Sequence, residues 1–313
     1  MQNKHHHHII PRAYLSGFEC PEKPSWIWVY ERGKNHNPGY MKSKYNPRQL
    51  PIKTKAGVAK DFYAAPNGQG GIDFNSNENI LEKQEFPSNS IFEKLRNSQM
   101  ITLTEKMVLS EYMAMLIRRV PKALVRQEEK WPELIKSTDI FTNILKQIDD
   151  AIQNTDVNDA KKILNLLFAR EVACKRWEEC KSEIPRDISR ALMVRESILI
   201  ADNLSQMTWQ FLVAPSDHLF ITSDNPIFFF SELGIKGHPS SEVSFPISKN
   251  IALAASWDKR VLEGLFHANS QSVEEINRRT ARNAHSEVYC SKPLRCVTEI
   301  LNKRNHQVSL IFG

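Results

Sequence analysis

The chain has 313 residues, of which 41% are hydrophobic and 25% are charged, as expected for a globular protein with one large domain or two lobes. Its net charge is +6, and its five cysteines are odd in number and form no Cys-x-x-Cys pair, which argues against a disulfide framework or a zinc ribbon. No apolar run approaches the roughly 20 residues of a membrane helix and no signal peptide opens the chain, so we expect a cytoplasmic protein with no membrane partner.

The N-terminal region, residues 1–79, combines a predicted strand with a long basic segment. Residues 26–30 (WIWVY) are rich in β-formers and follow a proline, which predicts a strand. Residues 32–60 then carry eight Lys or Arg side chains and no Asp or Glu. Clustered cations bind phosphate backbones, so Lys42, Lys44 and Arg48 are the candidate nucleic-acid-binding residues.

Four histidines, residues 5–8, lead without a linker into the apolar segment IIPRAYL. A purification tag is one explanation of such a run, but its direct continuation into an apolar segment favours a natural sequence. Imidazoles at His7 and His8 are then candidate metal ligands, and His8 is a candidate general base. The alternative is that these histidines pack under the first turn or are solvated.

The central region, residues 80–206, has helical periodicity. Thr102 and Glu105 form a capping box ahead of a long helix, which Pro121 ends or kinks. Further helices are predicted at about 132–153, 156–182 and 186–206. In the second of these, apolar residues keep roughly helical spacing, from Val157 through Leu164, Leu167 and Val172 to Trp177. We therefore expect a central helical bundle.

The C-terminal region, residues 207–313, returns to strands at about 208–213, 219–221, 227–230, 243–247, 251–255, 288–290 and 308–312, with a helix capped by Ser272 and Glu275. Neither terminal region looks large enough for a core of its own. The prediction is therefore an α+β fold in one domain, residues 1–313, with a mixed sheet built from N- and C-terminal strands around the helical bundle.

The turn Thr222-Ser223-Asp224-Asn225-Pro226 lies between two apolar runs of the C-terminal region. Asp and Asn tolerate unusual backbone angles and Pro fixes its own, so the segment predicts a turn at the end of a buried strand. Asp224 and Asn225 are either turn residues that bond to neighbouring backbone, or a metal- or substrate-binding pair. The sequence leaves both interpretations open.

Several landmarks together resemble the domain of unknown function 4238 family, over nearly the whole chain. They are, in order, His7-His8-x-Ile10-Pro11-x-x-Tyr14-Leu15-x-x-Phe18, Trp28-Val29-Tyr30, Asp61-Phe62-Tyr63, Arg119-Val120-Pro121, Ile221 to Pro226, Phe245 to Ser248 and the helix from Ser272 to His285. Val120 departs from the pattern, which usually has a small polar residue there. The resemblance implies a bacterial protein and marks candidate positions, but it carries no reaction.

The candidate catalytic residues are His8, Arg119, Asp224 and Asn225, with His7, His8 and Asp224 as ligands of a divalent ion such as Mg, Mn or Zn. His8, Arg119 and Asp224 are expected in one cleft. Arg119 is a candidate phosphate ligand or a structural ion-pair partner. Glu82 and Glu85, one helical turn apart, are further candidate ligands or a solvated helix face.

Two functions fit these residues. The first is a metal-dependent phosphodiesterase or nuclease acting in bacterial defence or as a toxin. The alternative is a non-catalytic module that senses nucleic acid or an anionic ligand, with a defence protein as partner; a purely structural partner in a complex is a third hypothesis. The absence of GxxxxGK[ST], GxSxG, HExxH and Rossmann glycine patterns argues against common nucleotidases, lipases, zincins and dehydrogenases.

Overall fold

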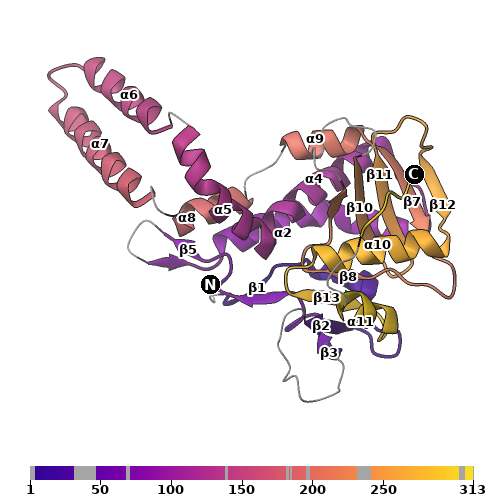
Figure 1. Cartoon of the computed structure of the whole chain (residues 1–313). Helices are drawn as coiled ribbons and strands as arrows, with labels where there is room; N and C mark the ends of the chain where they lie inside the picture. Colours follow the sequence, from indigo (N-terminus) through magenta and orange to yellow (C-terminus); the bar gives the residue numbers. More distant parts are fainter. Residues whose placement is uncertain are drawn as a thin grey trace. The chain divides into compact units, whose positions relative to one another are not determined.

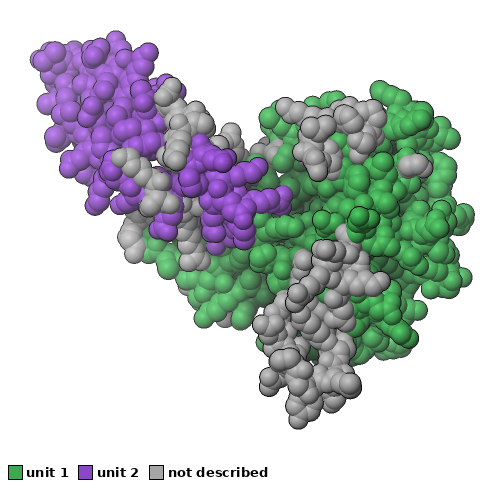
Figure 2. Space-filling view, viewed as in Figure 1, with its two compact units in different colours: residues 1–122, 193–313 green, residues 123–192 purple. Residues whose placement is uncertain are grey.

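The computed structural model of the protein describes residues 4–31, 47–67, 71–137, 140–180, 183, 185–194, 198–230, 241–302 and 307–312. They belong to two compact units, residues 1–122 with 193–313 and residues 123–192 (Figure 2). The first unit contains strands from both ends of the chain, so the α+β prediction is confirmed. The sequence predicted one domain, whereas residues 123–192 form a unit of their own.

The largest sheet of the first unit has the strand order β12-β7-β11-β10-β9, with the pair β12 and β7 parallel and the others antiparallel. Its strands are β7 (Thr208–Val213), β9 (Phe228–Phe230), β10 (Glu242–Ser248), β11 (Ile251–Ser256) and β12 (Gly264–His267). Every residue of β10 and β11 is buried. Of the two, β11 (IALAAS) is an almost continuous apolar run, whereas β10 (EVSFPIS) alternates polar and apolar side chains although it is buried.

A second, antiparallel sheet joins the two ends of the chain in the order β3-β2-β13-β8. Its strands are β2 (Trp26–Glu31), β3 (Arg48–Pro51), β8 (Thr222–Ser223) and β13 (Glu287–Cys290). Residue Trp28 lies opposite Cys290, and β13 also pairs with β8. The prediction that N- and C-terminal strands share a sheet is confirmed, although the C-terminal strands divide between two sheets.

Two small antiparallel pairs complete the strands of the first unit. They are β1 (His6–His8) with β4 (Val58–Lys60), and β5 (Ala65–Pro66) with β6 (Ile72–Asp73). In the first pair His7 lies opposite Ala59 and His8 opposite Val58. The histidine run is thus a strand held at the end of the basic segment.

Helices cover both faces of the large sheet (Figure 1). All helices and short 3-10 turns described in the first unit, whether or not they contact this sheet, are α1 (Arg12–Leu15), η1 (Ser16–Phe18), α2 (Ser76–Glu85), η2 (Phe86–Ser88), α3 (Asn89–Arg96), α4 (Leu103–Arg119), α9 (Ile198–Gln206), α10 (Ser270–Asn283) and α11 (Arg295–Asn302). On one face of β10, Tyr14 stacks on Phe245 and contacts Phe92. On the other face, Arg279 of α10 pairs with the buried Glu242. Alternation along β10 therefore separates an aromatic layer from a buried ion pair.

The second unit is helical, with α6 (Ile140–Gln153) and α7 (Ala160–Cys180) side by side as a hairpin (Figure 1). Helices α5 (Pro121–Ser137) and α8 (Arg186–Val194) run across its two boundaries with the first unit. Phe141 stacks on Trp177, with ring centroids 4.8 Å apart, and Arg170 pairs with Asp149. These contacts define the inner face of the hairpin.

The sequence predictions for the helical region agree with the structure at the helix ends. The capping box is confirmed, since Thr102 Oγ1 accepts from Glu105 N and Glu105 Oε2 accepts from Thr102 N. Helix α4 ends before Pro121, which begins α5. The helix predicted at about 156–182 is α7, but the apolar residues that gave its spacing do not form a buried face, since Val157, Leu164, Leu167 and Val172 are exposed.

Two predictions in the C-terminal region also need correction. Helix α10 begins at Ser270, earlier than expected, because Asn269 caps it by accepting from Ser272 N. Residues 308–312 form no strand; the buried carboxylate of Glu242 instead accepts the backbone N–H groups of Ile311 and Phe312. Side-chain acceptors have taken the place of a strand partner for this segment.

Candidate functional site

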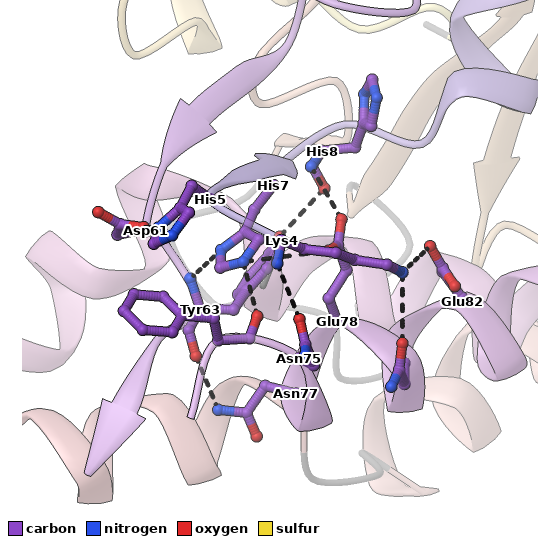
Figure 3. Close-up of polar contacts among 12 residues, drawn as sticks. Lys4, His5, His7, His8, Asp61, Tyr63, Asn75, Asn77, Glu78 and Glu82 are labelled. Atoms are coloured by element: carbon purple, nitrogen blue, oxygen red, sulfur yellow. Dashed lines mark hydrogen bonds and ion pairs between the residues drawn. The ribbon is translucent and has the colours of Figure 1, made fainter. Parts of the chain in front are cut away.

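The histidine strand β1 sends its neighbouring side chains to different places, because successive residues of a strand point to opposite faces. His7 is fully buried, and His8 lies at the wall of a pocket. Lys4, just before the strand, reaches across to α2, where its Nζ donates to Asn79 and Glu82 (Figure 3). The strand is therefore tied to α2 on one side and paired with β4 on the other.

His7 has a structural role that fixes its tautomer (Figure 3). The backbone N–H of Tyr63 can only donate, so His7 Nδ1 accepts at 2.8 Å. The carbonyl of Phe74 can only accept, so His7 Nε2 carries the proton and donates at 2.8 Å. Both ring nitrogens are used, and His7 offers no free lone pair to the metal ion that the sequence suggested.

The pocket beside His8 has a volume of about 500 Å³ and takes its walls from β1, α1, the turn after β3, α2 and the end of α4. His8 Nε2 donates to the carbonyl of Lys53 at 3.2 Å, which leaves the lone pair on Nδ1. That Nδ1 is buried and has no hydrogen-bond partner among the described residues. Burial, reinforced by Arg12, lowers the pKa of His8 to about 4. His8 is therefore a neutral acceptor at pH 7.

Arg119 holds three wall segments together, although it is itself fully buried. Its Nε donates to Tyr63 Oη at 3.0 Å, its Nη1 pairs with Glu85, and its Nη2 donates to the carbonyl of His8. Burial alone would disfavour the charge, but Tyr63 and Glu85 raise the pKa of Arg119 above its ordinary value. The guanidinium donates to these groups and to Met115 Sδ, so it positions the walls of the site and is not available to a phosphate.

Three carboxylates of α2 line one side of the pocket: Glu78, Glu82 and Glu85. Their spacing of i, i+4 and i+7 places them on one face of the helix. Glu82 pairs with Lys4, and Glu85 with Arg119. Glu78 is 5% exposed, and its Oε2 accepts no hydrogen bond among the described residues; the nearest cation is Lys4 Nζ at 3.9 Å. Glu78 is thus a buried carboxylate with unused acceptor capacity.

Two cations, Arg12 of α1 and Lys53 of the turn after β3, also line the pocket, as does the carboxylate of Glu19. Both cationic side chains are exposed, and neither forms an ion pair with a described residue. A guanidinium and an ammonium that are not committed to a carboxylate can both contact an incoming anion. The pocket therefore combines two cations that are free to contact an anion with several carboxylate and imidazole acceptors.

Asp224 sits elsewhere, in the turn after β8, where its side chain bonds to the turn between α10 and β13. Its Oδ1 accepts from His285 N at 2.7 Å, and its Oδ2 accepts from Ser286 N at 2.7 Å, Ser286 Oγ at 2.8 Å and Glu287 N at 3.0 Å. It is 1% exposed and does not line the His8 pocket. The expectation of one cleft holds for His8 with Arg119, but the bonds of Asp224 are those of a turn residue.

Asn225 has the same structural character. Its Nδ2 donates to Asn283 O at 2.9 Å, and Asn283 Nδ2 returns a bond to Asn225 O at 2.9 Å. A further bond from Asn283 reaches Ile227 O at 2.8 Å. The two amides thus clamp the turn after β8 onto the C-terminal end of α10.

The remaining candidates divide between described and undescribed residues. Lys42 and Lys44 lie outside the described residues. Arg48 begins β3 and pairs with Glu31 of the neighbouring strand β2. Within the described ranges no group of three or more His, Cys, Asp or Glu side chains is arranged to hold a metal ion. None of the described helices is long and apolar enough to span a membrane.

Four charged residues of the pocket were absent from the sequence-based candidates: Arg12, Glu19, Lys53 and Glu78. The spacing of Glu78 with Glu82 and Glu85 was a usable signal, because it marks one helix face. No comparable signal singles out Lys53 among the eight cations of residues 32–60. Its place in the pocket depends on the fold of the turn after β3.

Comparison with known proteins gives one match. The family model described as "Protein of unknown function (DUF4238)" matches residues 6–293. No curated protein and no solved structure matches the chain. The matched range includes every wall of the pocket as well as the turn of Asp224.

Proposed function

The chain belongs to the DUF4238 family, a family of unknown function, and from the geometry of the His8 pocket we propose that the protein binds a small anionic ligand there. The observation that carries the proposal is the combination of cations and acceptors that line the pocket. Arg12 and Lys53 are cations without a described ion pair, and they share a pocket with two acceptors that lack hydrogen bonds, His8 Nδ1 and Glu78 Oε2.

The cations and the acceptors of the pocket together define the chemistry of the ligand. An anionic group, a phosphate or a carboxylate, contacts Arg12 and Lys53, where charge-assisted hydrogen bonds are strong. Hydroxyl or amino groups of the same molecule donate to Glu78 and His8, which otherwise remain buried without partners. Neutral His8 favours this arrangement, since a protonated imidazole has no acceptor. Phosphorylated sugars and nucleotides have both features.

Calorimetric titration of the full chain tests the proposal with three probes: inorganic phosphate, a nucleoside 5′-monophosphate and a short single-stranded oligonucleotide. The double variant Arg12→Gln/Lys53→Gln should weaken binding of the monophosphate by at least about tenfold. Lys55→Gln is the matched control, because Lys55 lies two residues from Lys53, is exposed and does not line the pocket. Equal affinity in wild type and double variant would refute the proposal.

The substitution Glu78→Gln distinguishes the contribution of the acceptor residues to binding from that of Arg12 and Lys53. It keeps the shape of the side chain but replaces an acceptor-only carboxylate with a group that also donates. We expect this variant to bind the monophosphate more weakly. Its affinity for inorganic phosphate, which would contact Arg12 and Lys53, should stay within about twofold of the wild type. A change of the same size for both probes would point to a non-specific loss of structure.

A second candidate is the metal-dependent phosphodiesterase or nuclease that the sequence suggested. The observation that favours it is the neutral His8, whose free Nδ1 can act as a general base or a ligand of a divalent ion. Cleavage of single- and double-stranded DNA and of RNA with Mg, Mn or Zn, abolished by His8→Gln, would support it. Action in bacterial defence or as a toxin, with a defence protein as partner, is a further hypothesis, checked by phage challenge of cells that express the chain.

A further inference from the structure

A second hollow of the first unit is lined mainly by α4 and α9, with Gln84 and Pro87 from the end of α2 and η2, and has a volume of about 310 Å³. We propose that this groove is a docking site for a basic amphipathic helix of a partner protein. The groove shares no lining residue with the His8 pocket. The proposal therefore does not depend on the function proposed for that pocket.

The floor and rims of the groove are apolar. Ala114 and Met115 of α4 and Ala201 of α9 form the buried part. Met107 and Ile198, which also line it, are 54% and 73% exposed. Methionine side chains adapt to irregular partners, and large exposed apolar side chains grouped at one hollow are typical of an interaction surface.

The apolar surface continues beyond the hollow along both helices. Leu103 lies one helical turn before Met107 on α4 and is 74% exposed, and Leu199 on α9 is 79% exposed. A small molecule that filled the hollow would leave these side chains in water. An occupant long enough to cover them fits the surface better, which favours a segment of protein.

The charge of the groove selects the partner. Among the described residues, the charged ones that line it are both acidic, Glu111 and Asp202, and no described Lys, Arg or His lines it. Glu111 forms no ion pair with a described residue, and the carboxylate of Asp202 accepts only from Gln206 Nε2, at 3.0 Å. In a chain of net charge +6 this patch has the opposite sign to the whole, so it attracts a basic segment.

The shape of the groove favours a helical segment. Leu103, Met107, Glu111 and Ala114 follow i, i+4, i+8 and i+11 spacing on α4, which is one helix face about 16 Å long. Asp202 and Ser205 continue the opposite wall on α9. A third helix laid between two helices places its residues i, i+4 and i+7 in such a groove. A partner helix of about three turns, with a lysine or arginine near Glu111 and another near Asp202, would fit this groove.

The test uses fluorescence anisotropy of the full chain with a labelled 16-residue peptide of leucine and lysine, whose leucines recur at i, i+3, i+4 and i+7. A peptide of the same composition with leucines spread around the helix, and a leucine/glutamate peptide, are the probe controls. We expect the first peptide to bind and both controls to bind at least about tenfold more weakly. Equal binding of the patterned and scrambled peptides would overturn the proposal.

Variants locate the binding. Glu111→Lys/Asp202→Lys should raise the Kd at least about tenfold, whereas Glu128→Lys/Glu129→Lys, with the same change of net charge on exposed residues of α5, should stay within about twofold.

The apolar contribution is tested in the same way. Met107→Asn should also weaken binding, and Leu262→Asn, at an exposed apolar residue outside the groove, should not. Equal effects of groove and control variants would overturn the proposal. So would binding of octylamine at the groove without binding of the peptide, because the site would then take a small apolar cation. Inorganic phosphate binding serves as the independent check on the His8 pocket.

Discussion

Asp224→Asn is the substitution that best separates a structural from a catalytic role for the most distinctive motif of the chain. The buried carboxylate accepts four hydrogen bonds, one on Oδ1 and three on Oδ2. Asparagine keeps the shape but brings one oxygen and one NH₂ group. In the better orientation its oxygen keeps the three bonds from Ser286 and Glu287, and the NH₂ group faces the N–H of His285. The N–H of His285 and the new NH₂ group are then donors that face each other without an acceptor, and three bonds lose their assistance from charge.

The cost follows from these losses. An unpaired buried donor costs about 1–3 kcal/mol, and a bond to a neutral acceptor is worth roughly half of one to a charged acceptor. Together they predict a decrease of about 3–4 kcal/mol in the free energy of unfolding. Ser286→Ala is the control, because it removes only the hydroxyl donor and should cost about 1 kcal/mol.

Urea unfolding followed by tryptophan fluorescence measures both variants. If Asp224→Asn unfolds within about 0.5 kcal/mol of the wild type, the turn does not need the carboxylate and our reasoning is wrong. A variant that keeps its stability but loses a ligand or an activity would favour the catalytic interpretation. The structure therefore predicts that any loss of function in Asp224→Asn accompanies a loss of stability.

Two further predictions concern pH. Because burial lowers the pKa of His8 from 6.5 to about 4, the unfolded chain takes up a proton that the folded chain does not, and the free energy of unfolding should fall as pH decreases through that window. In the His8→Gln variant the free energy of unfolding, measured by urea titration, should differ less between about pH 7 and about pH 4.5 than it does in the wild type. Burial raises the pKa of Glu287, so its ionisation removes stability as pH rises above 4.5. Glu287→Gln, whose oxygen can still accept from Tyr289, should be more stable than the wild type at neutral pH, and a difference that persists at low pH would contradict this.

The parts of the fold that the sequence predicted depend on local patterns. The capping box at Thr102 and the break at Pro121 are set by neighbouring residues, and both were correct. The exposure of the apolar residues of α7 could not be predicted, because periodicity identifies an apolar face without saying whether anything covers it. Leu164 and Leu167 are exposed because the hairpin uses the face of Trp177.

The site was predictable to the extent that its residues follow local rules. Adjacent histidines in a strand must point to opposite faces, but the sequence does not say which face is the core, so His7 and His8 received the same candidate role. Arg119 was correctly expected near His8, although its bonds to Tyr63 and Glu85 are positioning bonds. Asp224 illustrates the limit: turn chemistry and ligand chemistry favour the same residues, and only the donors supplied by residues 285–287 decide between them.

The pairing of β2 with β13 has a consequence for synthesis of the protein on the ribosome. Every described residue that lines the His8 pocket lies within the first 119, yet Tyr14 of α1 bonds to Thr222 and Pro246, and Trp28 pairs with Cys290. At about 5–20 residues per second, roughly 10–30 s separate translation of Arg119 from that of Cys290. During this interval the aromatic side chains of the N-terminal segment have no sheet to cover them. The nascent chain is therefore a substrate for chaperones until its last hundred residues emerge.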